Sequence, residues 1–123
     1  MHDILPPEPP FPPTGETFVT TPEKLRAQIG TFTLIDCRRR GAYDDATEVI
    51  AGAVWRDPET VLAWIAEVPR DKPVVVYCKY GHEVSLFVAG TLRARGYDVR
   101  SLAGGIAAWT KSGGATQPKG AKP

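Results

Sequence analysis

Short, mostly apolar runs predict buried strands in the middle of the chain. Two of them cover residues 32–36 and 73–77, and a further strand is predicted over 98–102. The first two runs are too short for ordinary helices and nearly continuous in their apolar character, as expected of strands covered on both faces. The first ends at Asp36, and the second is followed directly by Cys78. A polar or reactive side chain therefore stands where each of these strands stops.

Amphipathic stretches between the strands predict helices. Thr20 and Glu23 have the spacing of a capping box at the start of a helix. An Asp-Pro step opens a second helix with an apolar stripe over residues 57–69. The run 84–95 places its apolar side chains on one face, and Gly96 follows where a left-handed C-cap is expected. Helices and strands thus alternate along this region.

This alternation predicts an α/β fold, a parallel sheet with helices on both faces joined by right-handed crossovers. Ligands of such sheets bind at the carboxyl ends of the strands, where both Asp36 and Cys78 are expected. Further along, a tight turn at Gly104 and Gly105 leads into residues 106–109, which we expect to pack on the sheet.

The two ends of the chain differ from the middle in composition. Six of the twelve prolines fall within residues 1–13, a pattern that favours a flexible, extended segment over a packed helix or strand. Residues 113–123 are rich in Gly, Lys and Pro and predict a flexible tail. The folded domain is therefore expected over residues 14–112.

Composition limits the class of protein. A chain of 123 residues with 42% hydrophobic content can form one modest core, and its formal charge of +1 disfavours general binding to nucleic acid or to an anionic membrane. No apolar stretch is long enough to span a bilayer, and the N-terminus lacks the pattern of an export signal. Two cysteines are too few for a disulfide scaffold. We expect a single-domain protein of the reducing cytoplasm, with neither a membrane nor a nucleic acid as partner.

Cys78 has the position of a reactive thiol. The loop of residues 79–83 joins it to the helix that follows, so the sulfur faces a helix N-terminus. Backbone N–H groups of the loop and the positive end of the helix dipole favour a thiolate and any anion bound against it. Lys79 and His82 strengthen this effect when protonated, whereas Glu83 opposes it. A thiolate at this place can attack electrophilic sulfur, phosphorus or carbon.

Two other interpretations of these residues remain open. Most free cysteines are small buried side chains, and Cys78 can be one of them. A structural zinc would need four ligands, so Cys37 and His2 would have to converge with Cys78 and His82. We expect no metal site. Cys37 also ends a strand, but no helix follows it at once, and we do not expect it to be catalytic.

Three segments of the chain match the motifs of a known family. They are residues 34–38 with Tyr43 beyond them, residues 74–81, and residues 92–99 running into 102–109. On these segments the chain resembles the single-domain rhodaneses, the thiosulfate sulfurtransferase-like proteins. The likeness extends over nearly all of the chain outside its Pro-rich and Gly/Lys-rich ends.

The resemblance implies a rhodanese-like fold, a parallel five-stranded sheet with helices on both faces. It also implies that Cys78 is the catalytic residue and carries a persulfide, and that backbone amides of the loop 78–83 hold the sulfane sulfur. No cofactor is implied. The residues that we expect to bind the substrate are Lys79, Tyr80, Gly81, His82, Glu83, Asp36 and Arg38.

The resulting hypothesis is a rhodanese-type sulfurtransferase. It would take a sulfane sulfur from thiosulfate, polysulfide or a persulfide and pass it to a thiol, a cyanide-like acceptor or a protein acceptor. Glu83 departs from the family, because many thiosulfate-using members have a basic residue there, and this disfavours thiosulfate as the donor. In residues 48–53, only Ile50, Gly52 and Ala53 match the family's Gly-His-Ile-Pro-Gly-Ala string.

Two alternative functions use the same fold. The first is a non-catalytic binding or regulatory module, for instance in a response to metal or oxyanion stress. The second is a phosphatase or arsenate reductase. Cysteine phosphatases need an arginine six residues after the cysteine to clamp the oxyanion, and Val84 occupies that position.

Overall fold

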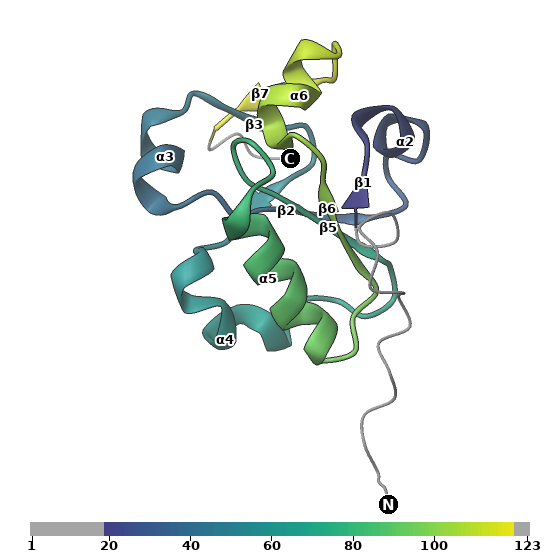
Figure 1. Ribbon diagram of the computed structural model, residues 1–123, viewed down its shortest axis with the longest axis vertical. Coiled ribbons are helices and arrows are strands. Elements are labelled where there is room, and N and C mark those ends of the chain that lie inside the picture. Colours follow the sequence, from purple (N-terminus) through teal and green to yellow (C-terminus); the bar gives the residue numbers. More distant parts are fainter. Residues whose placement is uncertain (1–18, 120–123) are drawn as a thin grey trace, which may run out of the picture.

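The computed structural model describes residues 19–119, in which five strands form one parallel sheet (Figure 1). The order of the strands is β1-β6-β5-β2-β4, and every neighbouring pair is parallel. The strands are β1 (Val19–Thr20), β2 (Thr33–Asp36), β4 (Val54–Trp55), β5 (Val74–Tyr77) and β6 (Val99–Leu102). The predicted α/β fold, a parallel five-stranded sheet with helices on both faces, is confirmed. The predicted proline-rich segment, residues 1–13, lies outside the described residues.

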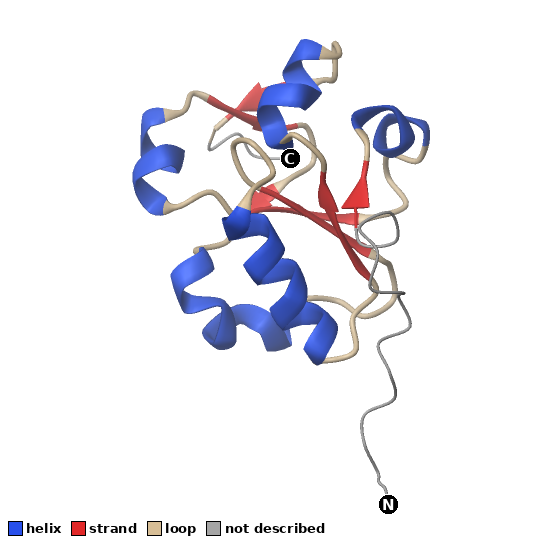
Figure 2. Cartoon of the chain, viewed as in Figure 1, coloured by secondary structure: helices blue, strands red, loops and turns tan. Residues whose placement is uncertain are grey.

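Helices cover the two faces of the sheet (Figures 1 and 2). One face packs against α4 (Val61–Trp64) and α5 (Glu83–Ala94), and the other against α2 (Pro22–Ala27) and α6 (Gly105–Lys111). A fifth helix, α3 (Arg40–Asp45), follows β2. Each face thus has its own hydrophobic cluster, with the sheet between them.

The central strand β5 contributes to both clusters. Val74 and Val76 pack on the side of α5, whereas Val75 and Tyr77 pack on the side of α6. All four side chains are fully buried, which explains the continuous apolar run in the sequence. Because side chains alternate along a strand, the next residue, Cys78, comes out on the α5 side.

Two predicted helices differ in detail from the structure. The N-cap of α2 is Thr21, not Thr20, and its hydroxyl accepts a hydrogen bond from the amide of Lys24. The helix expected over 57–69 is instead a short α4 between two 3₁₀ turns, Pro58–Thr60 and Ile65–Glu67. The hydroxyl of Tyr97 lies 2.9 Å and 2.8 Å from the carbonyl oxygens of Ile65 and Val68. These carbonyls are therefore satisfied without further helical turns.

Part of the predicted C-terminal tail belongs to the fold. Strand β7 (Thr116–Pro118) pairs antiparallel with β3 (Glu48–Ile50) in a separate two-stranded sheet. The indole N–H of Trp109 donates to the carbonyl of Ala115, and the ammonium group of Lys119 donates to the carbonyl oxygen of Tyr43 at 2.9 Å. Composition alone indicated a tail because the segment is poor in apolar residues. Backbone pairing and an aromatic anchor hold it, and neither leaves a compositional signal.

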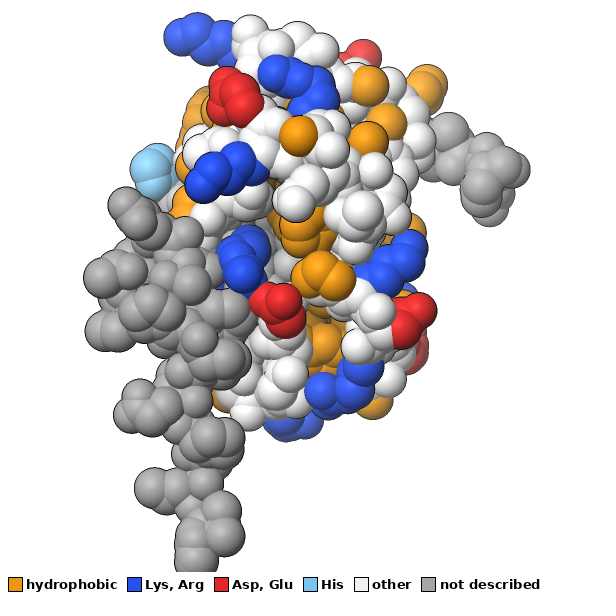
Figure 3. Space-filling model, turned by 90° about the vertical axis from the view of Figure 1, so that its right-hand side faces the viewer, with side chains coloured by type: hydrophobic (Ala, Val, Ile, Leu, Met, Phe, Trp, Pro, Cys, Tyr) orange, Lys and Arg blue, Asp and Glu red, His pale blue; other side chains and the backbone are white. Residues whose placement is uncertain are grey.

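The surface charge is mixed. On the face shown in Figure 3, basic and acidic side chains are interspersed. Within residues 19–119, no helix has both the length and the apolar character to span a bilayer.

The packing of Gly114 gives a test of the C-terminal segment. A Cβ atom at this position would overlap the indole ring of Trp109, whereas a Cβ at Gly90 in α5 would meet nothing within 4 Å. We expect Gly114→Ala to lower the free energy of unfolding by about 1–3 kcal/mol, as overpacking does. The control Gly90→Ala should raise it by up to about 1 kcal/mol. Urea unfolding measures both, and equal stabilities would show that residues 113–119 do not pack on Trp109.

Candidate active site

Cys78 follows β5 at the carboxyl edge of the sheet, in a pocket of about 190 Å³. Its side chain is 6% exposed and not part of a disulfide. The thiol donates a hydrogen bond to the hydroxyl of Ser85 in the first turn of α5, over 3.4 Å, and this hydroxyl donates to the carbonyl oxygen of His82 over 3.3 Å. The sulfur is thus sheltered but reachable through the pocket, and a hydroxyl group holds its orientation.

The loop after Cys78 is held in place by α6. The amide of Ile106 donates to the carbonyl of Cys78 and the amide of Ala107 donates to the carbonyl of Lys79, each over 3.0 Å. This approach requires glycine at position 105, because a Cβ there would overlap the carbonyl oxygen of Cys78. Gly105 also has φ +62°, a left-handed conformation that favours glycine. The Gly104-Gly105 turn of the sequence is therefore part of the support of the site.

Four of the five loop residues expected to bind substrate lie around Cys78. Lys79, Tyr80, His82 and Glu83 line the pocket, while Gly81 does not. Gly81 instead packs against the Gly104-Gly105 turn with φ +77°, and a Cβ there would come within 2.6 Å of the Gly104 nitrogen. Its role in the structure is to let the loop close.

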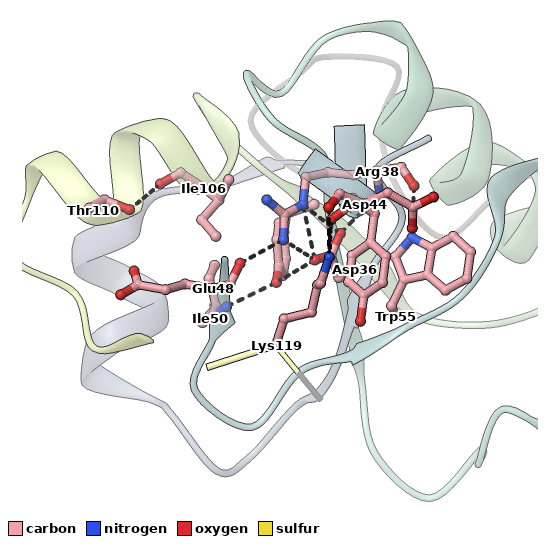
Figure 4. A network of polar contacts seen from close by, with 11 residues as sticks. Asp36, Arg38, Asp44, Glu48, Ile50, Trp55, Ile106, Thr110 and Lys119 are labelled. Carbon is pink, nitrogen blue, oxygen red and sulfur yellow. Dashed lines mark hydrogen bonds and ion pairs between the residues drawn. The ribbon is translucent and has the colours of Figure 1, made fainter. Parts of the chain in front are cut away.

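Asp36 and Arg38 form a buried ion pair beside this loop (Figure 4). Asp36 is fully buried and Arg38 is 5% exposed. Arg38 Nε lies 3.1 Å and 3.0 Å from the two carboxylate oxygens, and Arg38 Nη2 donates to Asp36 Oδ2 and to the carbonyl oxygen of Glu48. Arg38 reaches the pocket wall, whereas Asp36 does not line the pocket. Both side chains form hydrogen bonds within the protein, so we assign the pair a structural role.

Tyr77 extends this network to a third strand. Its hydroxyl donates to Asp36 Oδ2 over 3.1 Å and accepts a hydrogen bond from the amide of Ile50 over 3.0 Å. Burial and the nearby charge of Asp36 raise the pKa of Tyr77, so that it remains a donor. Strands β2, β5 and β3 are therefore joined by one set of buried polar contacts.

Cys37 lies next to Cys78. Its amide donates to the carbonyl of Tyr77 over 2.8 Å, which continues the β2–β5 pairing by one residue. The Cys37 side chain is fully buried. Burial, the charge of Cys78 and that of Asp36 raise the pKa of the Cys37 thiol, so it stays protonated.

Sequence reasoning missed two parts of the site. The first is Ser85, for which the available signal is a hydroxyl in the first turn of the helix that follows a reactive cysteine. The second is Gly105, where the sequence indicates a turn and the structure adds the close approach to the Cys78 carbonyl. For metals, no three His, Cys, Asp or Glu side chains come together within the described part of the chain in a way that could hold an ion.

The chain is similar to known proteins in sequence and in structure. The family model of the rhodanese-like domain matches residues 21–112. A tRNA sulfurtransferase from Desulfurococcus amylolyticus is 50% identical over 85 residues, a match that covers 69% of this chain and 16% of that protein. The chain therefore corresponds to a small part of this relative.

Solved structures show the same fold. The rhodanese-like domain of the Alr3790 protein from Anabaena sp. matches with a TM-score of 0.69 and 28% identity, covering 86% of this chain and 88% of that chain. A rhodanese-related protein from Thermoplasma volcanium matches with a TM-score of 0.72 and 21% identity, covering 80% and 96%.

The buried ion pair predicts a large loss of stability when one partner is removed. We expect Arg38→Met to lower the free energy of unfolding by about 3–5 kcal/mol, because Asp36 is left charged and buried. Arg39→Met is the control, since Arg39 and Glu59 are exposed and 3.7 Å apart, and an exposed pair contributes at most about 1 kcal/mol. Urea unfolding of the two variants would give equal losses if the Arg38–Asp36 pair were not structural.

Proposed function

Because the chain belongs to the rhodanese-like domain family, we propose that it is a sulfurtransferase in which Cys78 carries a persulfide. The observation that carries the proposal is the position of this thiol. Cys78 directly follows the central strand β5, lines a small pocket and precedes the N-terminus of α5. The likeness to a tRNA sulfurtransferase supports the same reaction class.

The proposed reaction has two displacements at sulfur. The Cys78 thiolate attacks the sulfane sulfur of the donor, a new S–S bond forms, and the donor's thiolate leaves with the electron pair of the broken bond. A nucleophilic acceptor then attacks the outer sulfur, and the Cys78 thiolate leaves. Electrons balance within the two steps, so the cycle needs no external oxidant or reductant. It suits a reducing compartment such as the cytoplasm.

The loop supplies groups that suit an anionic sulfur. Within the described chain, no residue accepts a hydrogen bond from the backbone N–H groups of residues 79–82, so these donors are available to a ligand. The N-terminus of the twelve-residue helix α5 adds its positive dipole end. Ser85 can turn its hydroxyl hydrogen toward the sulfur once the thiol is deprotonated.

The pocket favours a persulfide or polysulfide over thiosulfate as donor. Glu83 lies both on the pocket wall and in the first turn of α5, where its carboxylate competes with a bound anion for the helix dipole. Thiosulfate would bring its sulfonate close to this carboxylate. Ala42 and Val84 add apolar surface that suits the internal sulfur atoms of a polysulfide or the organic group of a persulfide.

The pocket does not suit a phosphate ester. Val84 lines it at the position where a cysteine phosphatase has its oxyanion-binding arginine. Arg38, which also reaches the pocket, uses its guanidinium on Asp36 and on the carbonyl of Glu48. Sulfur transfer therefore fits these residues better than phosphoryl transfer.

We expect Cys78→Ser to abolish sulfur loading, because oxygen cannot carry a sulfane sulfur. The measurement is intact-mass spectrometry after incubation with polysulfide and removal of the excess, where wild type should gain one sulfur atom. Proteolysis should place this sulfur on the tryptic peptide 71–79. Thermal unfolding of Cys78→Ser serves as the control for folding. A Cys78→Ser protein that loaded sulfur as wild type does would refute the proposed mechanism.

The charge of Glu83 gives a prediction about donor choice. Glu83→Arg should raise kcat/KM for thiosulfate roughly two- to thirtyfold, which corresponds to about 0.5–2 kcal/mol of transition-state stabilisation. The same exchange should change kcat/KM for an uncharged persulfide donor much less. The matched control is Glu23→Arg, the same exchange in the first turn of α2. If both donors responded equally to Glu83→Arg, Glu83 would not face the incoming anion.

A further inference from the structure

The two cysteines of the chain lie directly opposite each other on neighbouring strands. Asp36 of β2 is the register partner of Tyr77 of β5, and the next residue on each strand is a cysteine. The hydrogen bond from the Cys37 amide to the Tyr77 carbonyl continues the pairing to that point. Paired strands lie about 4.8 Å apart, and disulfide bonds join residues whose Cα atoms are about 4.4–6.8 Å apart.

Both thiols point to the same side of the sheet. Cys37 belongs to the hydrophobic cluster beneath α5, together with Val88 and Ala89 of that helix. Cys78 contacts Ser85 of the same helix. Directly opposed residues of a parallel pair share a face, and these contacts agree with that rule. The two thiols therefore lie on the same face of the sheet, beneath α5.

Solvent reaches the two thiols differently. Cys78 lines the pocket, whereas Cys37 is fully buried and does not. An external thiol, donor or acceptor can therefore reach Cys78 only. Within the described chain, Cys78 is the one sulfur that Cys37 can react with.

We propose that Cys37 is a resolving thiol, which attacks the Cys78 persulfide when no acceptor takes the sulfur, forms a Cys37–Cys78 disulfide and releases hydrosulfide. This step rests on the proposed function, because it requires a persulfide on Cys78. Ordinary sulfur transfer needs Cys78 only. With the proposed step, Cys37 and Cys78 together form a dithiol pair that can close to a disulfide.

The step balances without a further reagent. The terminal sulfur of the Cys78 persulfide takes the proton of the Cys37 thiol. The Cys37 sulfur then bonds to Cys78 Sγ, the bond between Cys78 Sγ and the sulfane sulfur breaks, and the sulfane sulfur leaves as hydrosulfide with the electron pair. The sulfane sulfur is reduced and the two cysteine sulfurs are oxidised. A dithiol reductant is then the class of co-substrate that returns the protein to its reduced state.

Because Cys37 is buried, its attack on the persulfide is slower than transfer of the sulfur to an acceptor. Burial raises the pKa of the Cys37 thiol, which stays protonated and is therefore a weak nucleophile in the resting protein. The persulfide changes this by presenting a base next to the thiol and a leaving group on Cys78 Sγ. An acceptor that arrives promptly takes the sulfur first, and an unused persulfide is discharged.

The experiment compares the lifetimes of the persulfide in wild type and in Cys37→Ala, with Cys37→Ser as a second variant. Each full-length protein is loaded with polysulfide without oxygen, freed of excess reagent, and followed by intact-mass spectrometry and a sulfide electrode. In wild type, the added sulfur should be lost with release of about one hydrosulfide per chain, and tryptic peptides 27–38 and 71–79 should become joined by a disulfide. In both variants, the persulfide should last at least tenfold longer.

A second arm tests the pair without any persulfide. Diamide, an oxidant of thiols, should join the same two peptides in wild type within one chain. If wild type and Cys37→Ala load sulfur and lose it equally slowly, or if diamide forms no such disulfide, the resolving role is wrong while the proposed function stands. If neither protein loads sulfur, the proposed function fails and the resolving role fails with it, even where diamide shows that the two thiols can bridge.

Discussion

The buried ion pair between Asp36 and Arg38 is the interaction on which the arrangement of the site depends. Asp36 accepts hydrogen bonds from the Arg38 amide, the Arg38 guanidinium and the Tyr77 hydroxyl, so a charge at the carboxyl edge of the sheet is fully paired. Arg38 and Tyr77 in turn hold β3 through Glu48 and Ile50. Two neighbouring strand ends are thereby fixed relative to each other, and each of them bears a cysteine as its next residue.

The fold could be predicted largely from sequence, because its main elements are specified locally. The continuous apolar run of β5 and the positive-φ Gly96 at the end of α5 each have a physical reason within a few residues. The outcome at the C-terminus was different. Pairing of β7 with β3 joins residues about seventy positions apart, and residues 116–118 have no apolar pattern from which it could be inferred.

The nucleophile of the site could be predicted from the sequence, whereas most of the contacts around it could not. The position of Cys78 follows from one strand, one loop and one helix. The other contacts of the site join distant segments: α6 holds the loop through Ile106 and Ala107, and Cys37 comes to lie against Cys78 through the register of β2 and β5. Its place at the end of a strand predicts that Asp36 binds substrate. In the structure, the Asp36 carboxylate instead forms an ion pair with Arg38.

The edge strand β4 has a consequence for association with other chains. It has only two residues, Val54 and Trp55, and Pro58 follows shortly after, where no backbone N–H is available for a further ladder. The guanidinium of Arg40 lies 5.0 Å from the centre of the Trp55 ring and brings a charge to this edge. Short, charged edges resist pairing with foreign strands, so this side of the sheet is protected against edge-to-edge aggregation.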